Sequence, residues 1–304
     1  DCARACGRNS CFGGDALRRP VRPRRGNPLR AGAPNAITAR ALCSGLSGVQ
    51  FAIKARMMEN DLLLQRGAEY AALHDRIGTH WQLAVMFVLI AGLLDGIDGR
   101  IARLLHGQSR FGAELDSLAD AISFGVSPAL ILYLWSLSSL PRFGWIAALM
   151  LAVFAALRLA RFNAAIDSDE QPHKSAGFLT GVPAPAGAGL ALLPMFLWFW
   201  TDEPLLRSSY VVAPWTAFAA ILMVSSIATW AWGSLRLRRN IRFEALAVVV
   251  IIAAAAVTAP WHTVSAISIA YLLAIPFSIA AYGKVKRLRA KTRVTSVQGL
   301  PPIA

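Results

Sequence analysis

The amino-acid sequence predicts an all-α integral membrane protein, and three observations lead to that fold class. Hydrophobic residues make up 56% of the 304 residues and charged residues only 16%, which is unusual for a water-soluble domain of this length. The apolar residues form runs of about 18 or more, long enough to cross lipid as helices that satisfy their own backbone polar groups. The basic residues are segregated into particular loops.

We expect eight transmembrane helices, six in a core and two after it. The seventh is the weakest, because it is short and is followed by Pro260. The predicted spans are 35–54, 81–104, 114–138, 143–164, 182–200, 211–232, 243–259 and 262–282.

These spans divide the chain into four parts. Residues 1–33 are rich in Arg, Gly and Pro and predict a disordered basic arm. Residues 34–232 form a six-helix membrane core, residues 233–282 two additional transmembrane helices, and residues 283–304 a basic tail. Within the core, the stretch 57–80 is long for a hairpin, and we expect a short surface helix there on the non-cytoplasmic side.

The first span begins with residues that suit a helix start. Pro34 is favourable at the first helical position, and Asn35 or Thr38 either caps the helix or faces a functional site. Gly45 and Gly48 allow a neighbouring helix to approach closely.

The net charge of +14 is explained by membrane topology. The basic residues do not form one patch with interleaved aromatics, so we expect no nucleic-acid partner. In an eight-helix arrangement they fall on one side, and the loops of the opposite side are nearly uncharged. The positive-inside rule makes the basic side cytoplasmic. We therefore expect a multi-pass protein of the inner (cytoplasmic) membrane with both termini in the cytoplasm.

Four aspartates, Asp95, Asp98, Asp116 and Asp120, lie beside the second and third spans. A carboxylate at the centre of a membrane helix costs roughly 2.5 to 3.5 kcal/mol, so four of them require a compensating charge. Within each pair the residues are three or four positions apart and share one helix face. Carboxylate oxygens suit Mg²⁺ or Mn²⁺ better than zinc. The sequence thus predicts a divalent-cation site that opens to the cytoplasm.

The surroundings of the aspartates favour a nucleotide-linked substrate. Divalent ions held by shared carboxylates can clamp a pyrophosphate and orient the attacking and leaving oxygens. Gly99 and Gly112 leave room for a nucleotide beside the backbone, and Ala102 keeps the face of Asp98 uncluttered. These features predict a phosphoryl transfer.

Residues 95–120 resemble the signature of the CDP-alcohol phosphotransferase family, with the spacing Asp95-x2-Asp98-Gly99-x2-Ala102-Arg103-x8-Gly112-x3-Asp116-x3-Asp120. The resemblance implies a six-span helical core in which an alcohol displaces CMP from a CDP-linked lipid, with a divalent metal. It implies Asp95, Asp98 and Asp116 as ligands of a first metal, and Asp95, Asp116 and Asp120 as ligands of a second. Asp120 is also the candidate general base. The CDP-linked lipid would contact the motif from Asp95 to Asp116, including Arg103. Membrane cores of this family often form homodimers.

The flanks resemble bacterial members of the family that use L-serine as the acceptor. The resemblance rests on residues 111–129, 158–163 and 177–186. Members that use glycerol phosphate typically carry Pro after the third aspartate and Lys after the fourth, where this chain has Ser117 and Ala121. Two helices beyond the core also agree with the serine enzymes. The resemblance implies transfer of the phosphatidyl group from CDP-diacylglycerol to L-serine, giving phosphatidylserine and CMP.

A serine substrate would bring a carboxylate into a site crowded with negative charge, so a cation must receive it. We expect Arg158 or Arg161 in this role, because a guanidinium binds a carboxylate through two hydrogen bonds. Asn163, Lys174 or Ser175 are candidates to complete the pocket.

Three alternatives stay open at this point. The acceptor could be glycerol 3-phosphate, inositol phosphate or choline. The aspartates could belong to a cation or proton transporter, although the fixed glycines and the Ala-Arg pair argue against it, and transporter acids usually lie near the bilayer midplane. The aspartates could also form purely structural ion pairs with Arg100 and Arg103.

Overall fold

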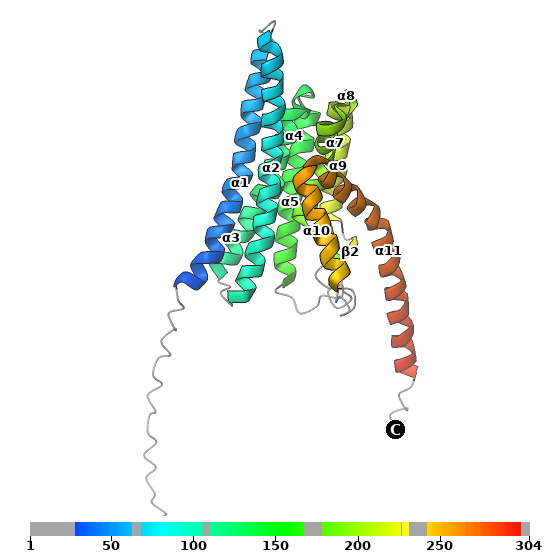
Figure 1. Ribbon diagram of the computed structural model, residues 1–304. Coiled ribbons are helices and arrows are strands. Elements are labelled where there is room, and N and C mark those ends of the chain that lie inside the picture. The colour runs from blue at the N-terminus through cyan, green and yellow to red at the C-terminus, as the bar shows by residue number, and fades with distance from the viewer. Residues whose placement is uncertain are drawn as a thin grey trace, which may run out of the picture.

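The computed structural model describes residues 28–62, 68–105, 110–166, 178–225, 227–230 and 242–298. These residues form a bundle of helices and two strands of three residues each. Figure 1 shows most helices running along a common axis, with α3 at one end of the bundle and α8 at the other. The all-α fold class is confirmed.

α1 packs along α2, its neighbour in the chain, whereas α5 packs against α9 and α7 against α11, which are distant in the sequence. A π-helical turn, Ala121–Val126, joins α3 to α4, and a 3-10 turn, Leu137–Ser139, follows α4. The helices are α1 Pro28–Leu62, α2 Ala68–Leu105, α3 Arg110–Asp120, α4 Ser127–Trp135, α5 Phe143–Ile166, α6 Ala184–Ala191, α7 Leu193–Thr201, α8 Pro204–Arg207, α9 Ser209–Val224, α10 Arg242–Thr258 and α11 Pro260–Gln298.

All eight predicted spans coincide with apolar helices, but a count of eight membrane crossings is not confirmed. In the described part of the chain, five helical segments are long and apolar enough to cross a membrane, and α6 with α7 makes a sixth if the bent pair is one span. The other two predicted spans fall on shorter apolar helices, Ser209–Val224 and Leu246–Thr258. The five long segments are Asn35–Leu62, Tyr70–Arg100, Phe111–Trp135, Phe143–Ala164 and Pro260–Ala281.

The predicted fifth span is bent, and the predicted sixth is shorter than expected. The axes of α6 and α7 differ by 43°, with Pro194 in the first turn of α7, where its missing N–H breaks the helical ladder. The helix α9 ends at Val224, and Ser225 has an extended backbone. The next residues form strand β2, Ala228–Trp230, which pairs antiparallel with β1, Phe178–Thr180.

The prediction of a surface helix over residues 57–80 is wrong. α1 continues to Leu62 and α2 begins at Ala68, so almost all of this stretch extends the two membrane helices. With 35 and 38 residues they are about 52 and 57 Å long, well beyond the roughly 30 Å of hydrocarbon in a bilayer. Figure 1 shows this hairpin rising past the rest of the bundle. α1 also begins at Pro28, ahead of the predicted boundary at residue 34.

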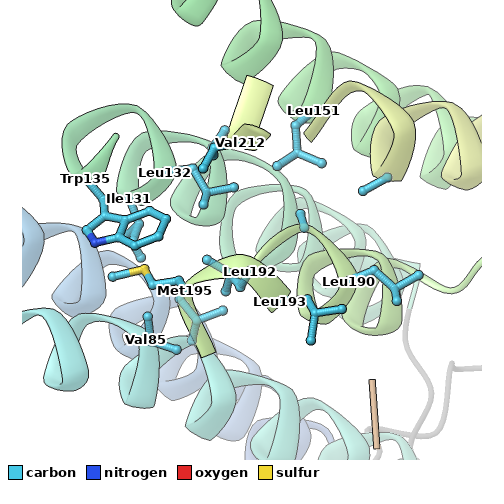
Figure 2. Close-up of a cluster of buried hydrophobic side chains, with 14 of the residues drawn as sticks. Val85, Ile131, Leu132, Trp135, Leu151, Leu190, Leu192, Leu193, Met195 and Val212 are labelled. Atoms are coloured by element: carbon cyan, nitrogen blue, oxygen red, sulfur yellow. The ribbon is translucent and has the colours of Figure 1, made fainter. Parts of the chain in front are cut away.

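Small residues let the helices approach closely, as predicted for the first span. A Cβ atom added at Gly48 would lie 2.6 Å from the Ala84 carbonyl oxygen of α2. Nearby, Ser44 Oγ donates a hydrogen bond of 2.7 Å to the Phe87 carbonyl oxygen. The bundle core lies farther along, where buried side chains of α2, α4, α5, α6, α7 and α9 meet around Leu192 and Met195 (Figure 2).

Replacing Gly48 by Ala should therefore loosen the α1–α2 pair. The added methyl group meets backbone rather than a movable side chain, and we expect a loss of about 1–3 kcal/mol and a lower midpoint of thermal unfolding in detergent. Gly78→Ala is the matched control in the same hairpin, because a Cβ there meets no atom within 4 Å. Alanine favours a helix over glycine by up to about 1 kcal/mol, so this variant should be neutral or slightly stabilised. Equal midpoints for the two variants would contradict the close approach.

Candidate active site

The four predicted aspartates come together between α2 and α3. The side chains of Asp95, Asp98 and Asp116 each offer an oxygen, and these oxygens all lie within 4.8 Å of one another. The Asp120 side chain, one turn beyond Asp116, lies within hydrogen-bonding reach of Asp95. The pairs at three- and four-residue spacing therefore face each other across the helices, as the sequence predicts.

Asp98 is the most buried of the four and is held by a residue from α1. Thr38 Oγ1 donates a hydrogen bond of 2.9 Å to Asp98 Oδ2. The two residues are only 5% and 4% exposed, so water does not compete for this contact. Of the two roles left open for Thr38, the structure supports the one that faces the site.

The helix that carries Asp116 and Asp120 is held in place by the π-helical turn that follows them. Its residues Ser123, Phe124 and Gly125 are buried. On one side, a Cβ at Gly45 of α1 would lie 3.0 Å from Ser123 Cα, and on the other, a Cβ at Gly125 would lie 2.8 Å from Ala155 Cβ of α5. The turn is thus wedged between α1 and α5. Such π-helical turns are frequent at functional sites.

Open space adjoins the cluster at Gly99, the residue after Asp98. Among the described residues, a Cβ atom built there meets no atom within 4 Å, in agreement with the prediction that this glycine leaves room for a ligand. Gly112 is half-buried in α3. Ala102 and Arg103 lie on α2, and their side chains are outside the part of the chain that the structure describes.

The two candidate arginines of α5 have different surroundings. Arg158 interacts electrostatically with Asp120 and with Tyr271 of α11, and its Nε atom is buried without a hydrogen-bond partner among the described residues. Arg161 is exposed, and its Nη1 donates a hydrogen bond of 3.3 Å to the Val224 carbonyl oxygen at the end of α9. Arg158 is therefore the arginine that adjoins the aspartates.

Asn163 also adjoins the cluster, through the residue after Asp116. Its Nδ2 donates a hydrogen bond of 2.8 Å to Ser117 Oγ. Lys174 and Ser175, the other two candidates for the acceptor pocket, lie outside the described residues. α5 thus contributes two polar groups, Arg158 and Asn163, to the side of the cluster formed by α3.

Tyr271 was not predicted from the sequence. It belongs to α11, which we expected to lie outside the catalytic core. The signal was a polar stripe in an otherwise apolar helix, since Ser265, Ser268 and Ser278 share one face with Tyr271 and are buried. Polar groups buried in a membrane helix usually face the bundle interior or a functional cavity.

The structural alternative, in which Arg100 and Arg103 neutralise the aspartates, is tested for Arg100 alone, because the Arg103 side chain lies outside the described residues. In the described residues the ion pairs within 4.0 Å involve Glu59, at the opposite end of the bundle, and Arg100 pairs with no site aspartate. The cluster offers only oxygen donors from two helices, and its open side adjoins Gly99. This donor set fits a hard divalent cation.

The sequence pattern of the CDP-alcohol phosphatidyltransferase family matches residues 32–292, which is most of the chain. The chain belongs to this family. The family depends on divalent cations in general, in agreement with the aspartate cluster. The match extends through α10 and most of α11.

Several proteins similar to this chain are named CDP-diacylglycerol–serine O-phosphatidyltransferase. The protein of this name from Mycobacterium tuberculosis (strain ATCC 25618 / H37Rv) is 39% identical over 260 residues, which cover 85% of this chain and 81% of the relative. That from Mycobacterium leprae is 35% identical over 252 residues, covering 81% and 74%. That from Bacillus subtilis is 35% identical over 157 residues, covering 51% and 79%.

Replacing Thr38 by Val should weaken cation binding without removing a carboxylate. The change deletes the donor to Asp98 Oδ2, and losing a partner that orients a ligand typically costs about 10- to 100-fold in metal affinity. Mn²⁺ titration followed by electron paramagnetic resonance would measure the affinity. Thr79→Val is the control, because Thr79 bonds the Asp75 carbonyl oxygen in the upper part of α2. Unchanged Mn²⁺ affinity in Thr38→Val would contradict the role of this contact.

Proposed function

We propose that this protein transfers the phosphatidyl group of CDP-diacylglycerol to L-serine, giving phosphatidylserine and CMP in phospholipid biosynthesis. The observation that carries the proposal is the four-aspartate cluster, in a chain that is 35–39% identical over most of its length to enzymes named for this reaction. The polar groups of α5 beside the cluster add a site for the acceptor.

The cation of this reaction is, in our proposal, Mg²⁺ or Mn²⁺. Asp95, Asp98 and Asp116 would hold it, with Asp120 completing a second position beside Asp95 and Asp116. When bound, the cation offsets the charge of the pyrophosphate and stabilises the charge that develops at phosphorus. The nucleotide would lie along the open face of α2 at Gly99, Ala102 and Arg103, with Gly112 opposite.

Arg158 is the residue we assign to the serine carboxylate. Its guanidinium adjoins Asp120, and its buried Nε has no hydrogen-bond partner among the described residues that would compete with a substrate. A bidentate contact fixes the orientation of a carboxylate better than a lysine ammonium does. Asn163, held against Ser117, would bound the same pocket, and Lys174 and Ser175 stay candidates from the adjoining loop.

The chemical step follows from where the acceptor is held. The serine hydroxyl oxygen attacks the phosphorus that bears the diacylglycerol, and the bond from that phosphorus to the oxygen of CMP breaks. Asp120 takes the hydroxyl proton, because it lies between the aspartate cluster and the arginine that orients serine. CMP leaves with the bonding electron pair.

The orientation we propose places the aspartates at the cytoplasmic face of the inner membrane. The ends of α2 and α3 that carry them adjoin the basic loops, and basic residues mark the cytoplasmic side. α1 begins and α11 ends at this same end of the bundle (Figure 1), consistent with both termini being cytoplasmic.

The acceptor assay tests the proposal directly. Purified protein with labelled CDP-diacylglycerol and Mn²⁺ should release CMP when L-serine is added, and should form phosphatidylserine in equal amount. Glycerol 3-phosphate, inositol phosphate and choline in the same assay should give only background release. CMP release with one of these and not with serine would overturn the serine assignment.

The control for this assay compares two variants, one that changes an aspartate inside the cluster and one that changes an aspartate outside it. Asp116→Asn should lower CMP release by several orders of magnitude, since it removes a cluster oxygen. Asp75→Asn, an exposed change elsewhere on α2, should leave it unaltered. Retained CMP release in Asp116→Asn would refute the assignment of Asp116 to the metal site.

Arg158→Lys should raise the KM for serine by tenfold or more, while the KM for CDP-diacylglycerol changes little. The lysine keeps the positive charge but loses the two-pronged contact, which is worth about 1.5–3 kcal/mol for a charged group. Arg161→Lys is the matched control three residues away and should keep wild-type serine kinetics, because Arg161 contacts the end of α9. Equal effects of the two changes would place the carboxylate contact elsewhere.

A further inference from the structure

We propose that a pocket at the end of the bundle opposite the aspartates binds the phosphate of an amine-bearing phospholipid headgroup. The pocket has a volume of about 590 Å³, which is within the range of small-molecule sites. It is formed by the ends of α4, α7, α8 and α9 together with one side chain of α1. Its lining is Arg56, Trp135, Ser136, Ser138, Ser139, Trp198, Asp202, Pro204, Arg207, Ser208, Ser209 and Tyr210.

The pocket lies at the depth of a lipid headgroup. Trp135 is the last residue of one candidate membrane span, and Phe143 is the first of the next. Thr201 ends the bent α6–α7 pair, and Ser209 begins α9. Tryptophans gather at this depth in membrane proteins, because their rings are apolar and their N–H groups are polar. The aspartate cluster lies near the other ends of its spans, so the two sites are separate.

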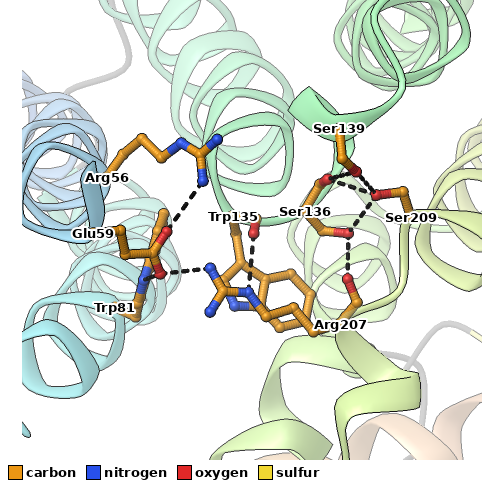
Figure 3. A network of polar contacts seen from close by, with 8 residues as sticks. All are labelled: Arg56, Glu59, Trp81, Trp135, Ser136, Ser139, Arg207 and Ser209. Atoms are coloured by element: carbon orange, nitrogen blue, oxygen red, sulfur yellow. Dashed lines mark hydrogen bonds and ion pairs between the residues drawn. The ribbon is translucent and has the colours of Figure 1, made fainter. Parts of the chain in front are cut away.

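Two arginines at the pocket share a single glutamate. Glu59 of α1 accepts hydrogen bonds from Arg56 Nη1 at 3.2 Å and Trp81 Nε1 at 3.0 Å, and Arg207 Nη2 also pairs with it (Figure 3). Arg56 and Arg207 carry one more charge than Glu59 neutralises, and the lining also holds the carboxylate of Asp202, so the pocket offers groups of both signs. Each guanidinium has five N–H donors, and most of those on Arg56 are unused among the described residues.

The Arg207 side chain is held in a fixed position, which favours specific binding of an anion. Its Nε donates to the Trp135 carbonyl oxygen at 3.2 Å, and its guanidinium lies 5.9 and 5.4 Å from the ring centres of Trp135 and Trp198. Ser136 Oγ donates to the Arg207 carbonyl oxygen at 2.6 Å. A guanidinium that is already oriented loses less entropy when it binds an anion.

Two hydroxyl groups complete a donor set for phosphate. Ser138 and Ser208 line the pocket, are half-buried, and make no side-chain hydrogen bond among the described residues. Hydroxyl and guanidinium donors together suit the unesterified oxygens of a phosphate.

The remaining lining residues indicate the rest of the ligand. Asp202 is exposed and offers a carboxylate to an amine in the same pocket. Tyr210 on the rim is 78% exposed, and Leu205 of the adjoining α8 is 63% exposed. These apolar surfaces continue outward to where acyl chains lie. Phosphate donors, an acceptor for an amine and an apolar rim together fit a phospholipid such as phosphatidylethanolamine.

Calorimetric titration of the purified full chain in detergent tests the proposal. The probes are dihexanoyl phosphatidylethanolamine, dihexanoyl phosphatidylglycerol, which lacks the amine, and inorganic phosphate. Excess EDTA keeps divalent cations away from the aspartates. We expect one phosphatidylethanolamine to bind per chain, about tenfold more tightly than phosphatidylglycerol, and equally well in Asp116→Asn. Asp202→Asn should remove this preference.

Two variants keep the fold while removing the phosphate donors. Arg56→Gln leaves Glu59 paired with Trp81 and Arg207, and the double change Ser138→Ala, Ser208→Ala removes no hydrogen bond within the described protein. Each should weaken lipid binding about tenfold, the scale of one charge-assisted or two neutral hydrogen bonds. Arg142→Gln changes an exposed arginine at the same end but outside the pocket, and it should leave lipid binding unchanged.

Three results would overturn the proposal. One is the absence of saturable lipid binding. Another is that Arg142→Gln weakens lipid binding as much as Arg56→Gln does, which would indicate non-specific electrostatic attraction of the lipid to arginines at this end of the bundle. The third is inorganic phosphate binding as tightly as the lipid and displacing it, which makes a soluble anion the ligand. CMP release measured in parallel separates these outcomes from a failure at the aspartate cluster.

Discussion

Four carboxylates in one cluster repel one another, and the apolar helices around them make this repulsion stronger than it is in water. Among the described residues, the contacts that oppose this repulsion include the hydrogen bond from Thr38 to Asp98, the hydrogen bond between Asp95 and Asp120, and the interaction of Asp120 with Arg158. Two of these three come from residues outside the cluster. The helices must therefore be held together from outside the cluster. The Thr38 hydrogen bond ties α1 to α2, and the contacts of Gly45 and Gly125 wedge the π-helical turn between α1 and α5. This packing holds the carboxylates of α2 and α3 close together.

The same constraint explains why a helix outside the six-helix core matters to the site. A cluster of negative charge accepts an amino-acid substrate only if a positive group is kept beside it. In our proposal Arg158 is that group, and it interacts with both Asp120 of α3 and Tyr271 of α11. A polar stripe of buried serines runs along the same face of α11. In this proposal the C-terminal helices contribute to the acceptor side, and the family match likewise continues to residue 292.

The sequence predicted what depends on local spacing and missed what depends on distant contacts. The aspartates and Gly99 follow from positions three and four apart on two helices, and the structure brings them together. The stretch 57–80 was misjudged because its charges suggested a surface, whereas Glu59 is paired with Arg207, 148 positions away. The different surroundings of Arg158 and Arg161 depend on the positions of α11 and α9, which are distant in the sequence. The π-helical turn needed the packing of α1 against α5, which no local pattern encodes.

The long hairpin of α1 and α2 runs along the whole bundle and makes polar contacts near both of its ends. Near one end Thr38 of α1 holds Asp98, and near the other Glu59 of the same helix is bonded to Trp81 of α2 and Arg207. A slip of α1 by one residue would move it about 1.5 Å and rotate it by about 100°, turning both side chains away from their partners. Each contact therefore fixes the register that the other requires. A ligand that stabilised the Arg56–Glu59–Arg207 group would, through this hairpin, also favour the arrangement that holds Asp98 in the cluster.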